Sequence, residues 1–320
     1  MSDTQTPLVA LVGPTASGKT RLAVDLALRL GGEVVSADSM QIYRHMDIGT
    51  ATPTEEERRG VPHHMMNILD PGESYSVAQY VEDARSVIRE VCSRGKLPVL
   101  AGGTGLYVSS LLDNVLFEEN RGDPALREEL AQRAREEGAQ ALWEELLRID
   151  PVSARRLHPN NLGRVIRAIE AFRLTGVPMS VQQERSRREP SPYRALVLGL
   201  AFRDRELLYR RIDLRVDQML KDGLLDEVRS LSEHFSATAA QAIGYKEFFR
   251  YLKGEETLEQ AAARVKQESR RYAKRQLTWF RRMEQVHWLY TEDFRDYNEL
   301  MTEACGLAEA FLLEGAERTQ

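Results

Sequence analysis

Cysteine is scarce in this chain. Of its 320 residues only two are cysteines, Cys92 and Cys305, which lie far apart and match no metal-ligand spacing. This excludes a disulfide-rich secreted scaffold and a zinc site built on cysteines. We expect both residues to be free thiols in a reducing cytoplasm.

Long apolar runs are also missing. No stretch approaches the ~20 apolar residues that a membrane-spanning helix needs, and residues 1–6 lack the basic start of a signal peptide. The hydrophobic fraction of 42% and the charged fraction of 29% are ordinary for a globular protein. We therefore expect a cytoplasmic protein without a membrane partner, long enough for a large core or for one domain with an insertion.

An overall positive charge is lacking, but one segment departs from that balance. The formal net charge of −5 argues by itself against a nucleic-acid partner. Residues 264–282 nevertheless carry eight basic side chains and a single acid, Glu268. A solvated helix face is the alternative, but acids should then stand at i,i+4 from the bases. Their near absence favours nucleic-acid contact. The bases are Arg264, Lys266, Arg270, Arg271, Lys274, Arg275, Arg281 and Arg282.

A phosphate-binding motif follows the first apolar run. Residues 8–12 predict a buried strand, and a helical pattern extends from the motif to about residue 30. Between them stands the pattern G-x-x-x-x-G-K-[ST], whose backbone N–H groups curl around a phosphate. Lys19 would bring a positive charge to the phosphates, and the Thr20 hydroxyl would hold Mg²⁺. The predicted phosphate-binding residues are Gly13, Pro14, Thr15, Ala16, Ser17, Gly18, Lys19 and Thr20.

The remaining pattern predicts an α/β fold. Strands that alternate with helices form a parallel sheet flanked by helices, here a P-loop NTPase-like core. Further strands are predicted at 33–37, 96–101, 195–201 and 286–290. Helices are predicted at about 76–94, 204–234, 241–252 and 257–283, with a final helix at the C-terminal end.

An all-helical segment interrupts this alternation. Residues 118–193 are charged and show helical spacing without a convincing strand. Gly122-Asp123-Pro124 opens the segment, and a Pro-rich stretch at 189–192 closes it. We expect an inserted helical subdomain over 118–193 and a core made of residues 1–117 and 194–320.

Asp38 comes directly after the second predicted strand. In an open parallel sheet, ligands bind beyond the carboxyl ends of the strands, so we expect Asp38 beside the P-loop. Its carboxylate could bind Mg²⁺, accept a proton from a nucleophile or cap a helix. The third strand ends in Gly102-Gly103 instead of the acid that is typical of ATPases and GTPases. This glycine turn would bring the Thr104 hydroxyl towards the same anion.

A group of arginines follows the strand at 195–201. Arg210, Arg211 and Arg215 offer one guanidinium that could reach the phosphates. The alternative is surface pairing with Asp213 and Asp217. The sequence leaves both interpretations open.

Two aromatic pairs also admit two interpretations. His63-His64 stands at no metal-ligand spacing, which favours an ordinary structural role. Trp279 and Phe280 lie in the basic segment and would either stack on nucleic-acid bases or pack in the core.

Together these blocks resemble one family, the tRNA dimethylallyltransferases, also called tRNA isopentenyltransferases. The blocks run in family order over nearly the whole chain, and the ordered set is specific although no single block is decisive. The chain lacks the C-terminal zinc finger of many eukaryotic members, which indicates the bacterial type. The blocks are GPTASGKT (13–20), DSMQIYR (38–44), DIGTA (47–51), PHH (62–64), LDP (69–71), GGTGLY (102–107), HPNNLGRVIRAIEAFRLTG (158–176), QAIGYKEF (241–248) and YAKRQLTWFR (272–281).

The resemblance implies a reaction. A dimethylallyl group would move from dimethylallyl diphosphate to N6 of the adenine on the 3′ side of the anticodon, in tRNAs that read codons beginning with U. The P-loop would then bind a diphosphate leaving group, and Asp38 would accept a proton from the attacking amine. With Mg²⁺ as cofactor, the groups that stabilise the growing diphosphate charge would be Lys19, Thr20, Thr104 and Arg211.

The resemblance also implies an RNA-binding surface, which we expect on a monomer. In the family, the helical insertion and the core grip the anticodon stem-loop of the tRNA. The matching positions fall beside Asp38, in the insertion and in the basic segment. The implied tRNA-binding residues are Asp38, Ser39, Met40, Gln41, Thr104, Arg127, Asn161, Leu162, Gly163, Arg164, Val165, Arg167, Lys274, Arg275 and Gln276.

Three rival functions can be told apart by what they require. A small-molecule kinase would turn over ATP and would have no use for the basic segment. An adenylate isopentenyltransferase acts on a free nucleotide, which needs neither the insertion nor that segment. A non-catalytic RNA-binding protein with a relic P-loop would not need Lys19, Thr20 and Asp38 intact.

Overall fold

The computed structural model describes residues 5–115, 122–186, 188–231, 235–236 and 238–317. The chain divides into two compact units. One unit, called the core unit below, joins Met1–Leu112 to Pro192–Gln320, and the other, called the insertion, is Asp113–Ser191. The sequence pattern placed the insertion at 118–193, but Tyr193 already pairs with Thr6 as part of a strand and therefore belongs to the core unit.

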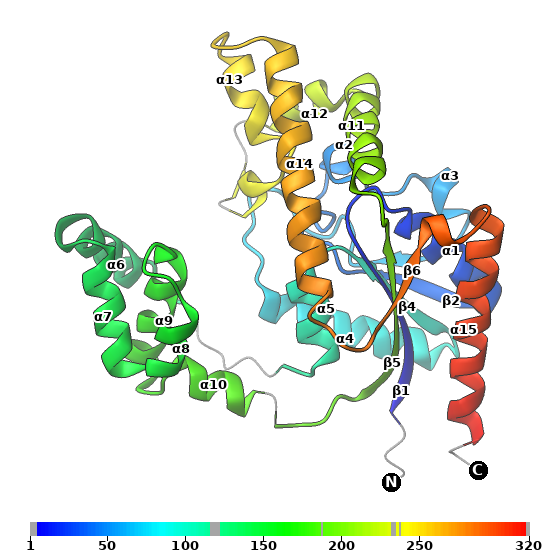
Figure 1. Ribbon diagram of the computed structural model, residues 1–320, viewed down its shortest axis with the longest axis horizontal. Coiled ribbons are helices and arrows are strands. Elements are labelled where there is room, and N and C mark those ends of the chain that lie inside the picture. The colour runs from blue at the N-terminus through cyan, green and yellow to red at the C-terminus, as the bar shows by residue number, and fades with distance from the viewer. Residues whose placement is uncertain (1–4, 116–121, 187, 232–234, 237, 318–320) are drawn as a thin grey trace. The chain divides into compact units, whose positions relative to one another are not determined.

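A parallel sheet forms the centre of the core unit (Figure 1). Within the described residues it has six strands in the order β3-β2-β4-β1-β5-β6, and every neighbouring pair is parallel. The predicted α/β class, a P-loop NTPase-like sheet flanked by helices, is confirmed. The strands are β1 (Thr6–Val12), β2 (Gly32–Ser36), β3 (His63–His64), β4 (Leu97–Gly102), β5 (Tyr193–Ala201) and β6 (Val286–Tyr290).

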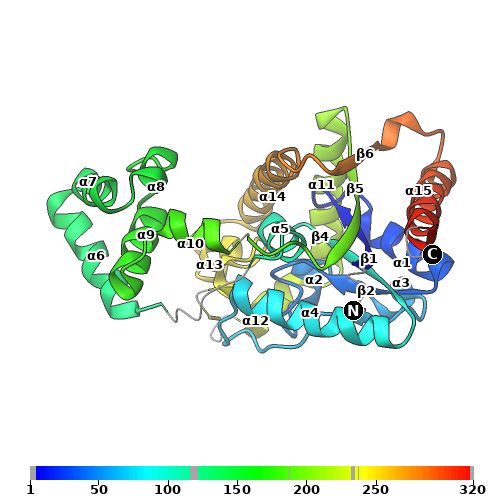
Figure 2. The ribbon, with the colours of Figure 1, turned by 90° about the horizontal axis from the view of Figure 1, so that it is seen from below.

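The central strands are buried on both faces, as the apolar runs require. In β1, Leu8 and Ala10 join one hydrophobic cluster, and Val9 and Leu11 join another on the opposite face, because successive side chains alternate. All four are 0% exposed, and burial of each larger side chain is worth roughly 2 kcal/mol. The first cluster includes residues of α4 (Val77–Ser93) and α5 (Gly105–Leu112). The second includes residues of α1 (Lys19–Leu30) and α15 (Tyr297–Glu317), which lie side by side (Figure 2).

The helices after β5 differ from the prediction in two places. The helix predicted over 204–234 breaks at Gly223, whose φ of 103° is incompatible with an α-helix. The helix predicted over 241–252 is instead a loop with short helical turns around the left-handed Gly244. These elements are α11 (Arg205–Lys221), α12 (Leu224–Leu231), η1 (Ala239–Gln241), η2 (Lys246–Phe248), α13 (Phe249–Leu252) and α14 (Leu258–Phe280).

Short elements between β2 and α4 and after β6 complete the core unit. The predicted pattern missed β3, because two residues are too few to form a period. The short elements are α2 (Asp47–Thr50), α3 (Glu55–Arg58) and η3 (Thr291–Asp293). Cys92 and Cys305 are both free thiols. Within the described part of the chain, no helix is long and apolar enough to cross a membrane.

The insertion is all-helical in its described residues and has a core of its own. Leu130, Leu142, Leu146 and Ile169 are each 0% exposed and belong to one cluster that contains only residues of this unit. The Asp123 carboxylate caps the first helix by accepting from two backbone N–H groups. The helices are α6 (Pro124–Glu137), α7 (Ala139–Ile149), α8 (Pro151–Arg156), α9 (Leu162–Thr175) and α10 (Met179–Arg185).

Candidate active site

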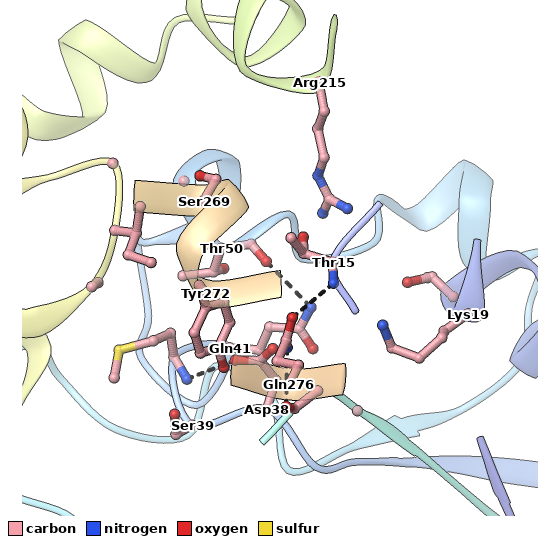
Figure 3. Close-up of a pocket in the computed structure, with 18 of the residues that line it drawn as sticks. Thr15, Lys19, Asp38, Ser39, Gln41, Thr50, Arg215, Ser269, Tyr272 and Gln276 are labelled. Atoms are coloured by element: carbon pink, nitrogen blue, oxygen red, sulfur yellow. Dashed lines mark hydrogen bonds between the residues drawn. The ribbon is translucent and has the colours of Figure 1, made fainter. Parts of the chain in front are cut away.

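A cavity of about 390 Å³ lies beside the carboxyl ends of β1, β2 and β4. Each strand contributes the segment that follows it: the P-loop after β1, Asp38 after β2 and Gly102-Gly103 at the end of β4. This is where ligands bind in open parallel sheets. Helices α11 and α14 complete the wall (Figure 3). Lining residues used below are Thr15, Lys19, Thr20, Asp38, Ser39, Met40, Gln41, Arg215, Tyr272, Arg275 and Gln276.

The P-loop has the conformation that its sequence predicts. A Cβ on Gly13 would lie 2.3 Å from the backbone oxygen of Leu200, so only glycine fits beside the neighbouring strand. Gly18 has φ 95° and stands as the N-cap of α1 without a side-chain cap. The N-terminal end of α1 therefore presents free N–H groups and a positive dipole end to an anion. The Lys19 ammonium folds back over the loop and donates to the Pro14 carbonyl at 2.6 Å.

Three charged groups share the cavity and shift one another's ionisation. Burial, with help from the neighbouring Arg215, lowers the pKa of Lys19 to about 7, while Asp38 opposes the shift. Burial raises the pKa of Asp38, although the Met40 N–H and Lys19 hold it back. Burial lowers the pKa of Arg215, as it does for Lys19, because burial disfavours the charged form of each group. In Figure 3 the side chains of Lys19 and Arg215 reach from different sides into the space near Asp38. A cavity with two buried cations and one acid is suited to bind an anion, because the anion would offset the buried positive charge.

Asp38 lies in the loop that follows β2 and caps no helix. Its Oδ1 accepts from the Met40 N–H at 2.9 Å, and the next helix along the chain begins only at Asp47. The neighbouring Ser39 N–H donates to Thr104 Oγ1 at 2.9 Å, and that hydroxyl donates to Ser39 Oγ at 3.2 Å. Thr104 therefore ties the glycine turn to the Asp38 loop. A contact between Thr104 and a diphosphate stays a prediction.

The arginine that faces this cavity is Arg215 and not Arg211. Arg211 lies in a second cavity, of about 350 Å³, on the other side of the P-loop, where its Nε donates to the Ala16 carbonyl at 2.9 Å. Arg215 lines the first cavity together with Ile212, Val216 and Met219. These four positions stand at i, i+3, i+4 and i+7 on α11, which is the spacing of one helix face. That spacing was the available signal for preferring Arg215.

Gln276, predicted to bind tRNA, has its amide occupied within the protein. It is 5% exposed, its Oε1 accepts from the Thr15 N–H at 2.9 Å and its Nε2 donates to the Gly103 carbonyl at 3.0 Å. The side chain thus joins α14 to the P-loop and to the glycine turn. Sequence distance hid this contact, because Thr15 and Gln276 are 261 positions apart.

The basic segment is more neutral than its local sequence suggested. The prediction that its bases lack acidic partners is wrong for four of the eight, since the acids come mainly from elsewhere in the chain. The ion pairs are Arg264–Glu256, Lys266–Asp217 at 2.6 Å, Arg270–Asp213 at 2.6 Å and Arg271–Glu268 at 2.5 Å. Lys274 and Arg275 are exposed and have no ion pair among the described residues, and Arg275 also lines the cavity. Phe280 is 0% exposed and Trp279 packs on Gly105, so the aromatic pair belongs to the core.

The predicted RNA-binding positions of the insertion divide by burial. Asn161, Gly163, Arg164 and Arg167 are exposed and Leu162 is half-buried. Val165 is 0% exposed within the core of the insertion, so its side chain has no surface to offer RNA.

Arg127 is held by a buried acid. Its Nε donates to Glu170 Oε2 at 2.9 Å, and Glu170 is 3% exposed. The same carboxylate accepts from the Asp123 N–H at 2.7 Å. The Arg127 side chain remains 45% exposed, so its orientation is fixed while part of its guanidinium faces solvent.

The histidine pair forms a short strand of the sheet, and its ordinary structural role stays a prediction. His63 and His64 form β3, His64 Nε2 lies 2.7 Å from Glu33 Oε2, and His63 Nδ1 lies 2.8 Å from the Val61 carbonyl. Glu33 is shared with Arg94 at 2.6 Å. His64 and the Nδ1 atom of His63 are thus engaged within the protein, whereas His63 Nε2 is buried without a hydrogen-bond partner among the described residues, and His63 lines the cavity.

Comparison with known proteins identifies relatives over almost the whole chain. The IPP transferase family matches residues 41–283, and the isopentenyl transferase family matches residues 6–67. The tRNA dimethylallyltransferase of Bacillus velezensis is 50% identical over 290 residues, which cover 90% of this chain and 92% of the relative. That of Thermoanaerobacter sp. is 45% identical over 297 residues, covering 92% and 94%.

Solved structures give the same result. The full-length tRNA isopentenylpyrophosphate transferase of Bacillus halodurans is 45% identical, with a TM-score of 0.73 and coverage of 98% of this chain and 99% of that one. A eukaryotic dimethylallyltransferase acting on tRNA is 28% identical, with a TM-score of 0.82 and coverage of 97% and 80%. The resemblance found in the sequence blocks is confirmed.

Proposed function

The chain belongs to the IPP transferase family, and from this premise we propose that it is a tRNA dimethylallyltransferase. It moves a dimethylallyl group from dimethylallyl diphosphate to N6 of the adenine 3′ to the anticodon, in tRNAs that read codons beginning with U. One observation carries the proposal: a single cavity brings together the P-loop, Asp38, which caps no helix, and Arg275, a cation that has no ion pair among the described residues.

The P-loop side of the cavity would hold the leaving group. As the bond between the allylic carbon and oxygen breaks, negative charge grows on the diphosphate. The N–H groups at the start of α1 and Arg215 supply positive charge before the substrate enters, and Lys19 adds its charge when the diphosphate binds. Preorganised donors of this kind are typically worth about 10²–10³ in rate each. Because diphosphate binding favours the protonated ammonium, Lys19 would regain full charge when substrate enters.

We propose that Mg²⁺ is the cofactor and that the substrate would complete its coordination in the cavity. Mg²⁺ often takes one or two protein oxygens and fills its remaining positions with phosphate oxygens and water. Thr20 and Asp38 line the cavity and offer hard oxygen donors, while no cluster of three metal-binding side chains occurs in the described residues. When bound, the ion would neutralise charge on the departing diphosphate. Thr20 would hold it through its hydroxyl.

Asp38 would act on the other reactant. The adenine N6 attacks the allylic carbon, the new C–N bond forms as the C–O bond breaks, and the amine must lose one proton. The Asp38 carboxylate is within the cavity and would accept that proton. An exocyclic amine is a weak nucleophile, so alignment of the two reactants supplies much of the acceleration.

RNA would be positioned by exposed cations of each unit. Lys274 and Arg275 on α14 have no acidic partner among the described residues, nor do Arg164 and Arg167 on α9. Such cations contact phosphates and position the RNA, while the target base leaves its stack at a cost of a few kcal/mol. Ser39 and Met40 line the cavity and would lie near that base. We further propose that the protein acts as a monomer in the cytoplasm.

Transfer of a radiolabelled dimethylallyl group tests the proposal. The acceptors are an anticodon stem-loop with adenines 3′ to a U-reading anticodon, AMP, and none, each with Mg²⁺. We expect label on the stem-loop alone, and a stem-loop whose target adenine is changed to guanine is the matched control. Label on AMP would make the protein an adenylate isopentenyltransferase. Absence of transfer with consumption of ATP would make it a kinase.

A further inference from the structure

A carboxylate outside the cavity, Glu227 on α12, holds one edge of the cavity in place. Its Oε2 accepts from the Ile48 N–H at 2.8 Å, and its Oε1 accepts from the Gly49 N–H at 2.9 Å. Oε1 also accepts from the Tyr245 hydroxyl at 2.6 Å. One side chain therefore joins three segments that are distant in sequence: α2, α12 and the loop before η2.

Helix α2 depends on this contact for its start. It has four residues, and its N-cap, Met46, makes no side-chain cap hydrogen bond. An isolated helix of one turn is not stable in water, because nucleation is costly. Glu227 supplies the missing acceptors from 178 positions further along the chain. The negative charge at a helix N-terminus adds to the stabilisation.

The fit between α2 and the loop of Tyr245 is close. A Cβ on Gly49 would lie 2.5 to 2.6 Å from atoms of the Tyr245 side chain, so only glycine is accommodated. Tyr245 is 0% exposed, and burial together with the neighbouring Glu227 raises its pKa. The phenol therefore stays protonated and donates to the carboxylate.

The far end of α2 contacts the loop that carries Asp38. The backbone oxygens of Thr50 and Ala51 accept from Gln41 Nε2 at 3.4 and 3.3 Å. Gln41 is 9% exposed, and its Oε1 accepts from Ser36 Oγ at 2.9 Å. Ser36 Oγ in turn accepts from the Asp38 N–H at 3.3 Å. A continuous chain of hydrogen bonds thus runs from Glu227 through α2 and Gln41 to Asp38.

We propose that Glu227 is a positioning residue for the transfer reaction, which acts through α2 and Gln41 on the loop that bears Asp38. The inference rests on the proposed function, because it takes the transfer reaction as the activity to be measured. Glu227 does not line the cavity, whereas Gly49, Thr50 and Gln41 do. Its effect must therefore reach the reactants through those residues.

The variant Glu227→Gln keeps the shape of the side chain and removes one acceptor. Two backbone N–H groups would then compete for a single amide oxygen, so α2 loses one of its anchors. We expect kcat for transfer to fall by about tenfold, since small displacements of a reacting group are costly. KM for dimethylallyl diphosphate and for the stem-loop should stay within about twofold, because the P-loop and the RNA-facing cations are untouched. Asp226→Asn, on the exposed side of the same helix, is the matched control and should leave kcat unchanged.

A double-mutant cycle separates this role from general weakening of the fold. Gln41→Met keeps the volume of Gln41 and interrupts the chain at its middle. If Glu227 acts through Gln41, the double variant loses no more kcat than the worse single variant. If the kcat losses of the two single variants multiply in the double variant, the inference is overturned. A Glu227→Gln enzyme with normal kcat would also overturn it. Should Glu227→Gln fail to fold, as judged by circular dichroism, Tyr245→Phe tests the same anchor in the same cycle.

The outcome is independent of the part assigned to Asp38. A cycle that shows coupling, together with an unimpaired Asp38→Asn enzyme, would keep Glu227 as a positioning residue and remove Asp38 as the proton acceptor. If the kcat losses in the cycle are independent and the Asp38→Asn enzyme is impaired, Asp38 stays the proton acceptor and Glu227 is not a positioning residue.

Discussion

The two halves of the basic segment, residues 264–272 on α14 and residues 273–282 at its end, carry four basic residues each and meet different neighbours in the fold. In the first half, Lys266 and Arg270 are paired with acids of α11 at 2.6 Å. In the second half, Lys274 and Arg275 are exposed and unpaired among the described residues, and Gln276 joins the helix to the P-loop. The first half fastens α14 to α11, and the second half serves the cavity and its surroundings.

The difference teaches that a run of bases does not by itself define a nucleic-acid surface. Asp213 and Asp217 stand about fifty positions before their partners, so no i,i+4 test could find them. Surface pairs of this kind are worth only about 0–1 kcal/mol each, yet they neutralise charge that RNA would otherwise attract. The comparison can be tested variant by variant.

Among the variants that test this comparison, the largest effect is expected at the contact between α14 and the P-loop. Gln276→Ala leaves the Thr15 N–H and the Gly103 carbonyl without their partner, which disturbs the loop that binds diphosphate. We expect kcat/KM for dimethylallyl diphosphate to fall by about 10- to 100-fold. Gln267→Ala, at an exposed position in the first half, should have no effect. Equal effects at the two positions would remove the distinction between the halves.

The pH dependence of the cavity is next in size. Diphosphate binds the protonated form of Lys19, whose pKa is lowered to about 7, so binding weakens as pH rises through that value. Asp38 must be ionised to accept a proton, and its raised pKa moves the acid limb to higher pH than for an ordinary carboxylate. The profile of kcat/KM should be bell-shaped, falling about tenfold per pH unit on the alkaline side. Lys19→Arg, whose charge persists, should lose the alkaline limb, and a flat wild-type profile above pH 7 would contradict the assignment.

RNA affinity should distinguish the unpaired cations from the paired ones. Replacing Lys274 and Arg275 together by alanine is expected to weaken binding of the anticodon stem-loop by about tenfold and to reduce its salt dependence. The same double replacement of Lys266 and Arg270 should change affinity by less than twofold. Binding isotherms over a range of salt concentrations provide the measurement. Equal losses of RNA affinity from the two double replacements would show that ion pairing does not keep Lys266 and Arg270 from contributing to RNA binding.

The smallest effect is expected when the partner acids are removed. Asp213→Asn with Asp217→Asn releases Arg270 and Lys266 from their ion pairs. Affinity for RNA should rise by a few-fold, while the free energy of unfolding falls by about 1 kcal/mol or less. Arg229 pairs with Asp226 on another helix, so Asp226→Asn is the control. Unchanged RNA binding would place the first half of the basic segment away from the RNA.

Local patterns predicted the parts of the fold that local forces determine. The P-loop and strands β1, β2, β4 and β5 follow from apolar runs and from glycines with special conformations. The irregular loop over 241–248 could not be predicted, because its shape depends on the anchor between Tyr245 and Glu227. Preferring Arg215 to Arg211 was possible only in part, because the spacing on α11 marks one helix face but does not show that this face is turned to the cavity. Contacts between distant segments decide such features.

The candidate site was predictable to a similar degree. Lys19, Thr20 and Asp38 do line one cavity, as the rule on strand ends requires. Gln276 and Gln41 were assigned to RNA from their blocks, whereas their amides are engaged within the protein. Side chains whose polar groups bond internally and those that await a ligand look alike in a sequence.

Single-turnover transfer by Asp38→Asn tests the central claim most directly. The amide is nearly isosteric with the carboxylate but accepts no proton, so the rate of label transfer to the anticodon stem-loop should fall by about 100-fold or more. The dissociation constant for the stem-loop should remain within a few-fold of the wild-type value, because the cations that position the RNA are unchanged. A transfer rate close to that of the wild type would contradict the claim that the chemistry of this cavity depends on Asp38.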